Sequence, residues 1–433
     1  MPVFLDSTSA DFETRFTALL SAKREDSPDV DDVVAGIIAD VRKKGDAAVL
    51  ALTAKFDRLA LTSDTMRFSA AEIEAECARV PEAEARALEL AAERIRAYHV
   101  RQMPEDAAWT DPEGARLGWR WTPVSAAGLY VPGGLASYPS SVLMNAVPAK
   151  VAGVERLAIC VPTPDGVVNP AVLLAAKIAG VDEIYRIGGA QAIAALAYGT
   201  ESIAPVDKIT GPGNAFVAAA KRRVFGKVGI DMIAGPSEIL VIADADNDPD
   251  WLALDLMSQA EHDESAQALL ICTDAAFGQK VAAAVEKRLE TLERREIAGA
   301  SWRDFGAIIT VSDLDEAARL SNRIAPEHLE LCVADPEALA EKFVHAGAIF
   351  LGAWTPEAIG DYVGGPNHVL PTARSARFSS GLSVMDFLKR TTMARMSPEA
   401  LGAIGPAAEV LARSESLEAH GLSVTARLQK LNG

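Results

Sequence analysis

The chain has 433 residues, with 60 acidic and 42 basic side chains, and its formal charge is −18 at pH 7. This charge argues against nucleic acid or an anionic membrane as a partner, because both attract clustered Lys and Arg. With 49% apolar and 24% charged residues, the composition is that of a globular protein. At about 150 residues per domain, the length predicts two to four domains with buried cores.

The cysteines predict a reducing compartment. There are four, and Cys160, Cys272 and Cys332 each lie in a short apolar run typical of a buried strand. Neither a CxxC pair nor a cysteine-dense segment occurs, so we expect no disulfide framework and no thiolate metal site. No run of about 18 apolar residues is present, and we therefore expect a cytoplasmic protein without a membrane segment.

The order of elements predicts an α/β fold. Residues 1–105 are helical in pattern, with apolar positions three and four apart. Short apolar runs then alternate with helices, beginning at Arg156, Glu183 and Val206. A second series of strands is expected at 238–243, 267–273, 306–311, 328–333 and 348–351. This alternation is typical of parallel sheets, so we expect two Rossmann-like layered domains.

We place the boundaries by these changes of pattern. After residue 375 we expect helices and no strand, in a segment too small to bury a core of its own. The expected parts are a helical N-terminal part packing with the larger domain (1–125), an α/β domain (126–235), a second α/β domain (236–375) and a C-terminal helical extension (376–433).

Three helix starts are marked by capping residues. Asn169 and Asp248 each precede a proline, which suits the first turn of a helix. Ser312 with Asp315 resembles a capping box before a third helix.

Two glycine-rich turns precede helices, GGAQ from Gly188 and GPGN from Gly211. A strand, a glycine turn and a helix N-terminus can hold a pyrophosphate through backbone N–H groups. Neither turn matches GxGxxG, so the usual dinucleotide fingerprint is missing. The spacing alone fits nucleotide binding less well than close packing of strand and helix.

Gln259 and His262 form a candidate metal pair. They lie three residues apart on an expected helix, so they project from one face and could share a divalent cation such as Zn²⁺. A polar helix face in solvent is the alternative, unless distant ligands converge on the pair.

Glu327 and His328 are adjacent at the start of an expected strand. A histidine beside a carboxylate is a candidate general acid/base pair. Asp361 opens a glycine-rich loop that ends in His368, where a carboxylate could face a site. His99 and His345 lie on otherwise structural helices, and we assign both to the scaffold.

Eight long blocks, in this order, resemble the histidinol dehydrogenase family. They include VSAAGLYVPGGLASYPSSVLMNAVPAKVAGV, IGGAQAIAALAYGTESI, VDKITGPGNAFVAAAKR, IDMIAGPSEILVIAD, LDLMSQAEHD, RIAPEHLEL, IGDYVGGPNHVLPT and ESLEAHGLSV. The resemblance spans essentially the whole chain, and so many blocks in register are a specific signal.

The resemblance implies a zinc-dependent oxidation of L-histidinol through L-histidinaldehyde to L-histidine with two NAD⁺, the last two steps of histidine biosynthesis. It implies a homodimer in which the C-terminal segment reaches the other subunit's site. The implied roles, carried over residue by residue, are zinc ligation by Gln259, His262, Asp361 and His420, acid/base catalysis by Glu327 and His328, further substrate contacts by Ser237, His368 and Glu415, and NAD contacts by Tyr130, Gln191 and Asn214.

The cysteines bear on the second oxidation. Many aldehyde-oxidising enzymes form a thiohemiacetal on a cysteine, and no cysteine here is placed to attack. We therefore expect a hydrated aldehyde, with Glu327 activating the water and His328 acting as base in both oxidations. Zinc could orient the substrate or polarise its oxygen, and the sequence leaves both open.

Three other functions remain open at this point. A relative on the same scaffold could oxidise another small polar alcohol, and retention of Ser237, Glu415 and the four metal positions argues against it. A metal-dependent hydrolase would use the same acid/base and metal residues without needing the glycine turns. A two-lobed binding protein would have no need of an acid/base pair.

Overall fold

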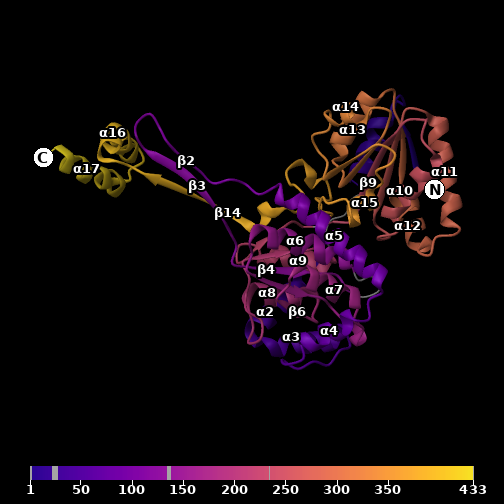
Figure 1. Ribbon diagram of the computed structural model, residues 1–433. Coiled ribbons are helices and arrows are strands. Elements are labelled where there is room, and N and C mark those ends of the chain that lie inside the picture. The colour runs from indigo at the N-terminus through magenta and orange to yellow at the C-terminus, as the bar shows by residue number, and fades with distance from the viewer. Residues whose placement is uncertain (1, 22–27, 134–137, 234, 433) are drawn as a thin grey trace. The chain divides into compact units, whose positions relative to one another are not determined.

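The computed structural model describes residues 2–21, 28–133, 138–233 and 235–432 (Figure 1). The chain divides into two compact units. The first consists of residues 1–101 and 125–387, and the second of residues 102–124 and 388–433.

The first unit contains a five-stranded parallel sheet in the order β6-β5-β4-β7-β8. Its strands are β4 (Ala126–Tyr130), β5 (Arg156–Cys160), β6 (Glu183–Tyr185), β7 (Lys208–Thr210) and β8 (Gly229–Ile230). Its connecting helices are α6 (Pro139–Ala152), α7 (Pro170–Ala179), α8 (Gly189–Tyr198) and α9 (Ala215–Val224). From β4 the chain adds β5 and β6 on one side of β4 and then β7 and β8 on the other side. A topological switch point therefore lies between β4 and β7.

Helices of the N-terminal part pack against the helices that connect the strands of this sheet. They are α2 (Pro28–Lys44), α3 (Asp46–Phe56), α4 (Ala70–Cys77) and α5 (Glu82–Val100). Val34 and Val49 from this part enter the same buried cluster as Ile193 and Val217 of α8 and α9. The N-terminal helices therefore complete the hydrophobic core of the first sheet.

The first unit also contains a six-stranded parallel sheet in the order β1-β11-β10-β9-β12-β13. Its strands are β1 (Val3–Asp6), β9 (Glu238–Ala243), β10 (Gln267–Cys272), β11 (Ala307–Thr310), β12 (His328–Cys332) and β13 (Ala348–Leu351). Its helices are α1 (Phe12–Ser21), α10 (Pro249–Ala260), α11 (Ala275–Leu289), α12 (Arg295–Phe305), α13 (Leu314–Ile324), α14 (Pro336–Ala340) and α15 (Glu357–Tyr362).

The strands at the centre of this sheet are buried on both faces. Along β9, Ile239 and Val241 enter one core cluster, and Leu240 and Ile242 enter the other. This explains why β9 reads as an uninterrupted apolar run, since both of its faces are covered by helices.

Four strands lie in parts that we predicted as helical, namely β1, β2 (Ala107–Thr110) and β3 (Arg116–Pro123) within 1–125 and β14 (Leu388–Arg395) within 376–433. Strand β1 lies in the stretch that we predicted as helical, because four residues at the edge of a sheet leave too short a pattern to detect. Strand β14 lies beyond residue 375, where we predicted no strand. Seven of its eight residues are exposed, so no apolar alternation marks it.

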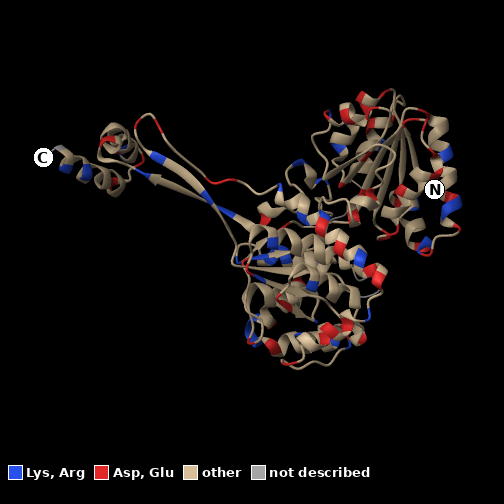
Figure 2. Ribbon diagram, viewed as in Figure 1, with Lys and Arg blue, Asp and Glu red and all other residues tan. Residues whose placement is uncertain are grey.

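The second unit is built on β14. It pairs antiparallel with β3 (Arg116–Pro123), which pairs in turn with β2 (Ala107–Thr110). Helices α16 (Pro398–Ser414) and α17 (Glu418–Asn432) follow and pack together. Lys and Arg residues occur along both β3 and β14 (Figure 2).

Two of the three predicted helix caps are confirmed. Asn169 and Asp248 cap α7 and α10 through bonds from the backbone N–H groups of Ala171 and Asp250. The third prediction was wrong by one residue. Asp313 is the cap of α13 and accepts a bond from the N–H of Glu316, whereas the hydroxyl of Ser312 donates to the side chain of Glu316.

A search of the described helices for a membrane-spanning segment finds none of sufficient length and hydrophobicity.

Candidate active site

Glu327 directly precedes β12 and His328 begins it, and β12 lies between β9 and the edge strand β13 of the six-stranded sheet. His328 is in register with Ile239 of β9, and Ser237 directly precedes β9. In most open α/β sheets the ligand site lies outside the carboxyl ends of the strands. In this sheet the predicted acid/base pair instead lies at the amino edge.

His328 is held in one tautomer. Its Nδ1 lies 2.9 Å from the carbonyl oxygen of Glu238, which can only accept a hydrogen bond, so Nδ1 carries the proton. Its Nε2 is buried and has no hydrogen-bond partner among the described residues. Burial lowers the pKa of the imidazole below its usual value, so Nε2 offers a lone pair near neutral pH.

Glu327 is oriented by the same strand. Its Oε2 accepts a hydrogen bond of 2.9 Å from the backbone N–H of Glu238, and it lies 3.7 Å from Nδ1 of His328. Both side chains are buried. The backbone of Glu238 therefore fixes the carboxylate and the imidazole side by side.

Two further carboxylates face Nε2 of His328. Glu357 Oε1 lies 3.7 Å from it and Asp361 Oδ1 lies 3.9 Å from it. One donor atom from each of the three side chains falls within 4.8 Å of the others, a grouping that could hold a metal ion. Burial and the neighbouring Glu357 raise the pKa of Asp361 well above its usual value.

The sequence analysis did not single out Glu357. Glu357 and Asp361 are four residues apart on α15, which places them on one helix face. That spacing was a usable signal, but it also occurs on many solvated helix faces.

Gln259 lies on α10 as predicted, but His262 does not share the helix, because α10 ends at Ala260 and His262 lies in the turn that follows. Gln259 is fully buried, and its Nε2 lies 3.3 Å from Nδ1 of His262, which is exposed. Ser258 Oγ donates to Glu357 Oε2 over 2.9 Å and so ties the end of α10 to α15. The Oε1 atoms of Gln259 and Glu357 are buried without a hydrogen-bond partner among the described residues.

The buried donor atoms of Gln259, Glu357 and His328 that lack partners among the described residues fit a divalent cation. Buried oxygen and nitrogen atoms that lack partners are costly unless a ligand satisfies them. Imidazole nitrogens together with amide and carboxylate oxygens are ligands that zinc accepts.

His368 and Ser237 lie close to these groups. His368 Nδ1 lies 3.1 Å from the backbone oxygen of Asp361, and its Nε2 lies 3.3 Å from Ser141 Oγ on α6. Burial lowers the pKa of His368 to about 4, so its ring is neutral near pH 7. Ser237 is half-buried, and its carbonyl accepts a bond from the N–H of Gln267.

Glu415 and His420 belong to the second unit. Glu415 is the C-cap residue of α16, and His420 lies on α17. Both are exposed. Their predicted contribution to a site stays a prediction.

The three predicted NAD contacts lie at the carboxyl end of β4 and in the segments that follow β6 and β7 of the five-stranded sheet. Tyr130 ends β4, and its hydroxyl accepts a bond of 3.1 Å from the N–H of Gly189. Gln191 is buried in the first turn of α8. Asn214 caps α9, accepting bonds from the N–H groups of Phe216 and Val217. Tyr130 and the turn before Asn214 therefore meet at the switch point between β4 and β7.

The cysteines are not suited to nucleophilic attack. All four fall within the described residues, and none forms a disulfide. Cys160, Cys272 and Cys332 are buried in strands, and burial raises the pKa of each thiol, that of Cys272 to about 11. Burial also raises the pKa of Cys77. Thiolates, which are the reactive form, are therefore scarce at neutral pH.

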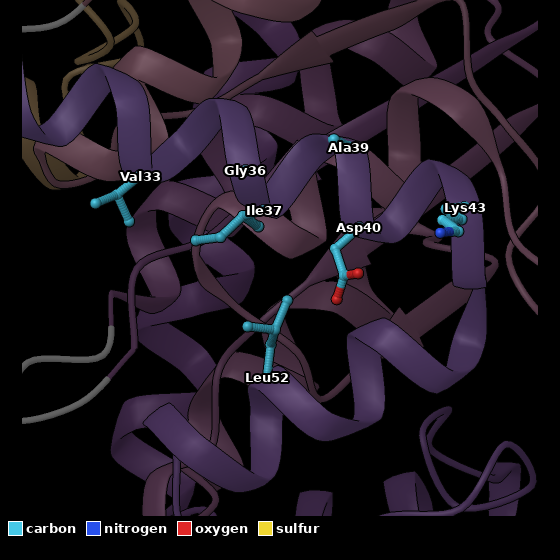
Figure 3. A pocket seen from close by; sticks show the side chains of 7 residues that line it. All are labelled: Val33, Gly36, Ile37, Ala39, Asp40, Lys43 and Leu52. Atoms are coloured by element: carbon cyan, nitrogen blue, oxygen red, sulfur yellow. The ribbon is translucent and has the colours of Figure 1, made fainter.

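A shallow hollow of about 420 Å³ lies elsewhere, between α2 and α3 (Figure 3). Its lining is largely apolar, with Asp40 and Lys43 as the charged members. It contains none of the residues predicted to act in catalysis or binding.

Comparison with known proteins connects this geometry to a family. The sequence pattern of histidinol dehydrogenases matches residues 20–428. The chain belongs to the histidinol dehydrogenase family. Histidinol dehydrogenase of Ruegeria pomeroyi is 82% identical over 433 residues and covers 100% of both chains. That of Cereibacter sphaeroides is 77% identical over 432 residues, again with 100% of both chains covered.

A solved structure of the same family has the same fold. The crystal structure of histidinol dehydrogenase from Elizabethkingia anophelis superposes with a TM-score of 0.95 at 36% identity, covering 100% of this chain and 99% of the other. The predicted α/β class with two layered sheets is therefore confirmed, and so is the predicted family.

Proposed function

We propose that this protein oxidises L-histidinol to L-histidine through L-histidinaldehyde, using two NAD⁺ in succession and a bound zinc ion. The observation that carries the proposal is membership of the histidinol dehydrogenase family over residues 20–428. The arrangement around His328 supports it, because a neutral, buried imidazole with an available Nε2 is suited to general base catalysis.

In the first oxidation, His328 Nε2 accepts the hydroxyl proton of the substrate. The carbinol carbon loses a hydride at the same stage, and the product is the aldehyde. NAD⁺, when bound, supplies the hydride acceptor for each oxidation. The bond from Nδ1 to the carbonyl of Glu238 keeps the base in the required tautomer throughout.

The second oxidation begins with addition of water to the aldehyde. Glu327 takes a proton from that water as the new C–O bond forms, and His328 returns the proton from the first oxidation to the carbonyl oxygen, which gives the hydrate and frees Nε2 to act as base again. His328 then accepts a hydroxyl proton from the hydrate while its carbon loses the second hydride, which leaves the carboxylic acid of histidine, and this acid releases its remaining proton to water. The buried, protonated cysteines support this route over a thiohemiacetal.

Gln259, His262 and Asp361 would hold the zinc ion, with His420 supplied by a second copy of the chain. Zinc, when bound, supplies a Lewis acid that can orient an amine and an imidazole or polarise an oxygen. In this proposal His368 and Ser237 contact the substrate, and Glu415 from the second copy pairs with its ammonium group. We further propose that the protein is a cytoplasmic homodimer.

Cofactor binding is assigned to Tyr130, Gln191 and Asn214. The amide oxygen of Asn214 is engaged in capping α9, so its NH₂ group is the part it would offer to NAD⁺. The helix N-termini of α8 and α9 suit the negative charge of a pyrophosphate.

The test is to follow reduced nicotinamide by absorbance while L-histidinol is titrated into the protein. We expect about two NADH per histidinol consumed, loss of activity with a chelator and recovery on addition of Zn²⁺. Formation of about one NADH, with free aldehyde accumulating, would refute the four-electron assignment. Turnover without any change in nicotinamide absorbance would favour the hydrolase instead.

A further inference from the structure

A buried ion pair lies beneath the turn that joins β7 to α9. It links Lys221, near the end of α9, to Asp231, which follows β8, and their side chains are only 3% and 1% exposed. Neither residue was singled out by the sequence analysis, and neither belongs to the proposed catalytic or metal groups.

Both members of the pair form hydrogen bonds with the backbone of Gly211. Asp231 Oδ2 accepts a hydrogen bond of 2.8 Å from the N–H of Gly211. Lys221 Nζ donates a hydrogen bond of 2.9 Å to the carbonyl of Gly211. Both backbone polar groups of this glycine are therefore bound by buried charges, and charge-assisted bonds are the stronger kind.

Gly211 is also held against Tyr130. Its φ of +113° lies in a region that favours glycine, and an added Cβ would lie 2.1 Å from the backbone oxygen of Tyr130. The turn from Gly211 to Asn214 is therefore fixed on one side by the ion pair and on the other by β4.

Fold stability alone gives little reason for this arrangement. Burying two opposite charges costs desolvation energy, and a well-packed apolar pair is often as stable or more stable. The ion pair does supply a fixed geometry that apolar side chains could not, because only a donor and an acceptor together can bind both groups of one residue.

We propose that Lys221 and Asp231 are positioning residues for the dinucleotide. By fixing Gly211 they hold Asn214 and the N-terminus of α9 at the switch point, beside Tyr130. A preformed turn binds its ligand without the loss of conformational entropy that a mobile turn would suffer. This inference rests on the proposed use of NAD⁺ and adds two residues that do not touch the reacting atoms.

The experiment compares NAD⁺ binding, by calorimetry, with steady-state kinetics in two variants. K221M removes the donor to Gly211. The double variant K221M/D231N removes both charges and avoids a lone buried carboxylate, which could prevent folding of the single variant. We expect the Kd and the KM for NAD⁺ to rise about tenfold or more, with the KM for L-histidinol and kcat at saturating NAD⁺ changed by less than about twofold.

R156M is the matched control. Arg156 pairs with Glu183 at the amino ends of β5 and β6 in the same sheet, with side chains 24% and 17% exposed. Losing that pair should lower the melting temperature and leave the Kd for NAD⁺ within about twofold.

Three outcomes would overturn the inference. In the first, the folded double variant binds NAD⁺ as tightly as the natural protein. In the second, R156M weakens NAD⁺ binding as much as the double variant does, which would make the effect a general loss of stability. In the third, the natural protein fails to bind NAD⁺ at all, which would refute the proposed function first and this inference with it.

Discussion

At the scale of single residues, the chemistry of the candidate site is set by backbone groups. The N–H of Glu238 binds Glu327, and the carbonyl of Glu238 binds His328. A histidine becomes a base with a defined reactive nitrogen only when its other nitrogen is engaged. One residue of β9 thus gives two neighbouring side chains their separate roles.

These roles predict different effects of two substitutions. H328N should slow both hydride transfers by about 10²-fold to 10⁴-fold, because it removes the base used in each. E327Q should slow oxidation of supplied L-histidinaldehyde more than oxidation of L-histidinol, because only the former needs an activated water. Single-turnover measurements of NADH formation from each substrate would separate the two steps.

H345N provides the control for these substitutions. His345 is half-buried between α14 and β13, its backbone N–H donates a hydrogen bond to Asn322, and it has no assigned role in the chemistry, so its replacement should leave both rates within about twofold. Equal damage by E327Q to alcohol and aldehyde oxidation would contradict the role in water activation.

At the scale of elements, helix α4 shows how a local signal is reinforced by tertiary contacts. Ser69 and Glu72 form a complete capping box at its start. The backbone N–H of Ser69, with help from Arg186, lowers the pKa of Glu72 to about 2. Arg186 follows β6 and also lies over the ring of Phe68, 3.8 Å from its centroid. The cap therefore also joins α4 to the five-stranded sheet.

This shift predicts a pH-dependent stability. The folded pKa of Glu72 lies below its unfolded value, so the stabilisation is present above the unfolded pKa and is lost as pH falls through about 2. E72Q should lower the melting temperature at pH 7, and the difference from the natural protein should shrink between about pH 5 and pH 2.

S69A is the companion variant. Loss of the N-cap should cost about 1 kcal/mol at neutral pH, measured by urea unfolding. A difference between E72Q and the natural protein that stayed constant from neutral to acid pH would contradict the ionised cap.

At the scale of the whole molecule, the proposed metal set draws on both units of the chain. Gln259, His262 and Asp361 belong to the first unit and His420 to the second. If His420 comes from a second copy, two inactive proteins can restore each other. We expect H262N mixed with H420N to regain activity after subunit exchange, since a mixed dimer has one site with both ligands.

Random exchange gives about half mixed dimers with one complete site each, so recovery should approach about a quarter of the natural activity. Each variant exchanged with itself is the control and should remain inactive. If the mixture also remained inactive after demonstrated exchange, a site shared between copies would be refuted.

The sequence by itself determined what depends on local pattern. Apolar runs predicted β9 to β13 of the six-stranded sheet and β5, β6 and β7 of the five-stranded sheet, because strands such as β9 are buried on both faces and carry an unbroken signal. Proline after a capping residue located α7 and α10. Long blocks in order identified the family.

Only the tertiary structure decided what depends on contacts between distant residues. The exposed strand β14 exists because β3 pairs with it, and no periodicity announces that pairing. The tautomer of His328, the approach of Glu357 and the ion pair beneath Gly211 each join residues from separate elements. A sequence records the donors and acceptors of these bonds but not which of them the fold brings within reach.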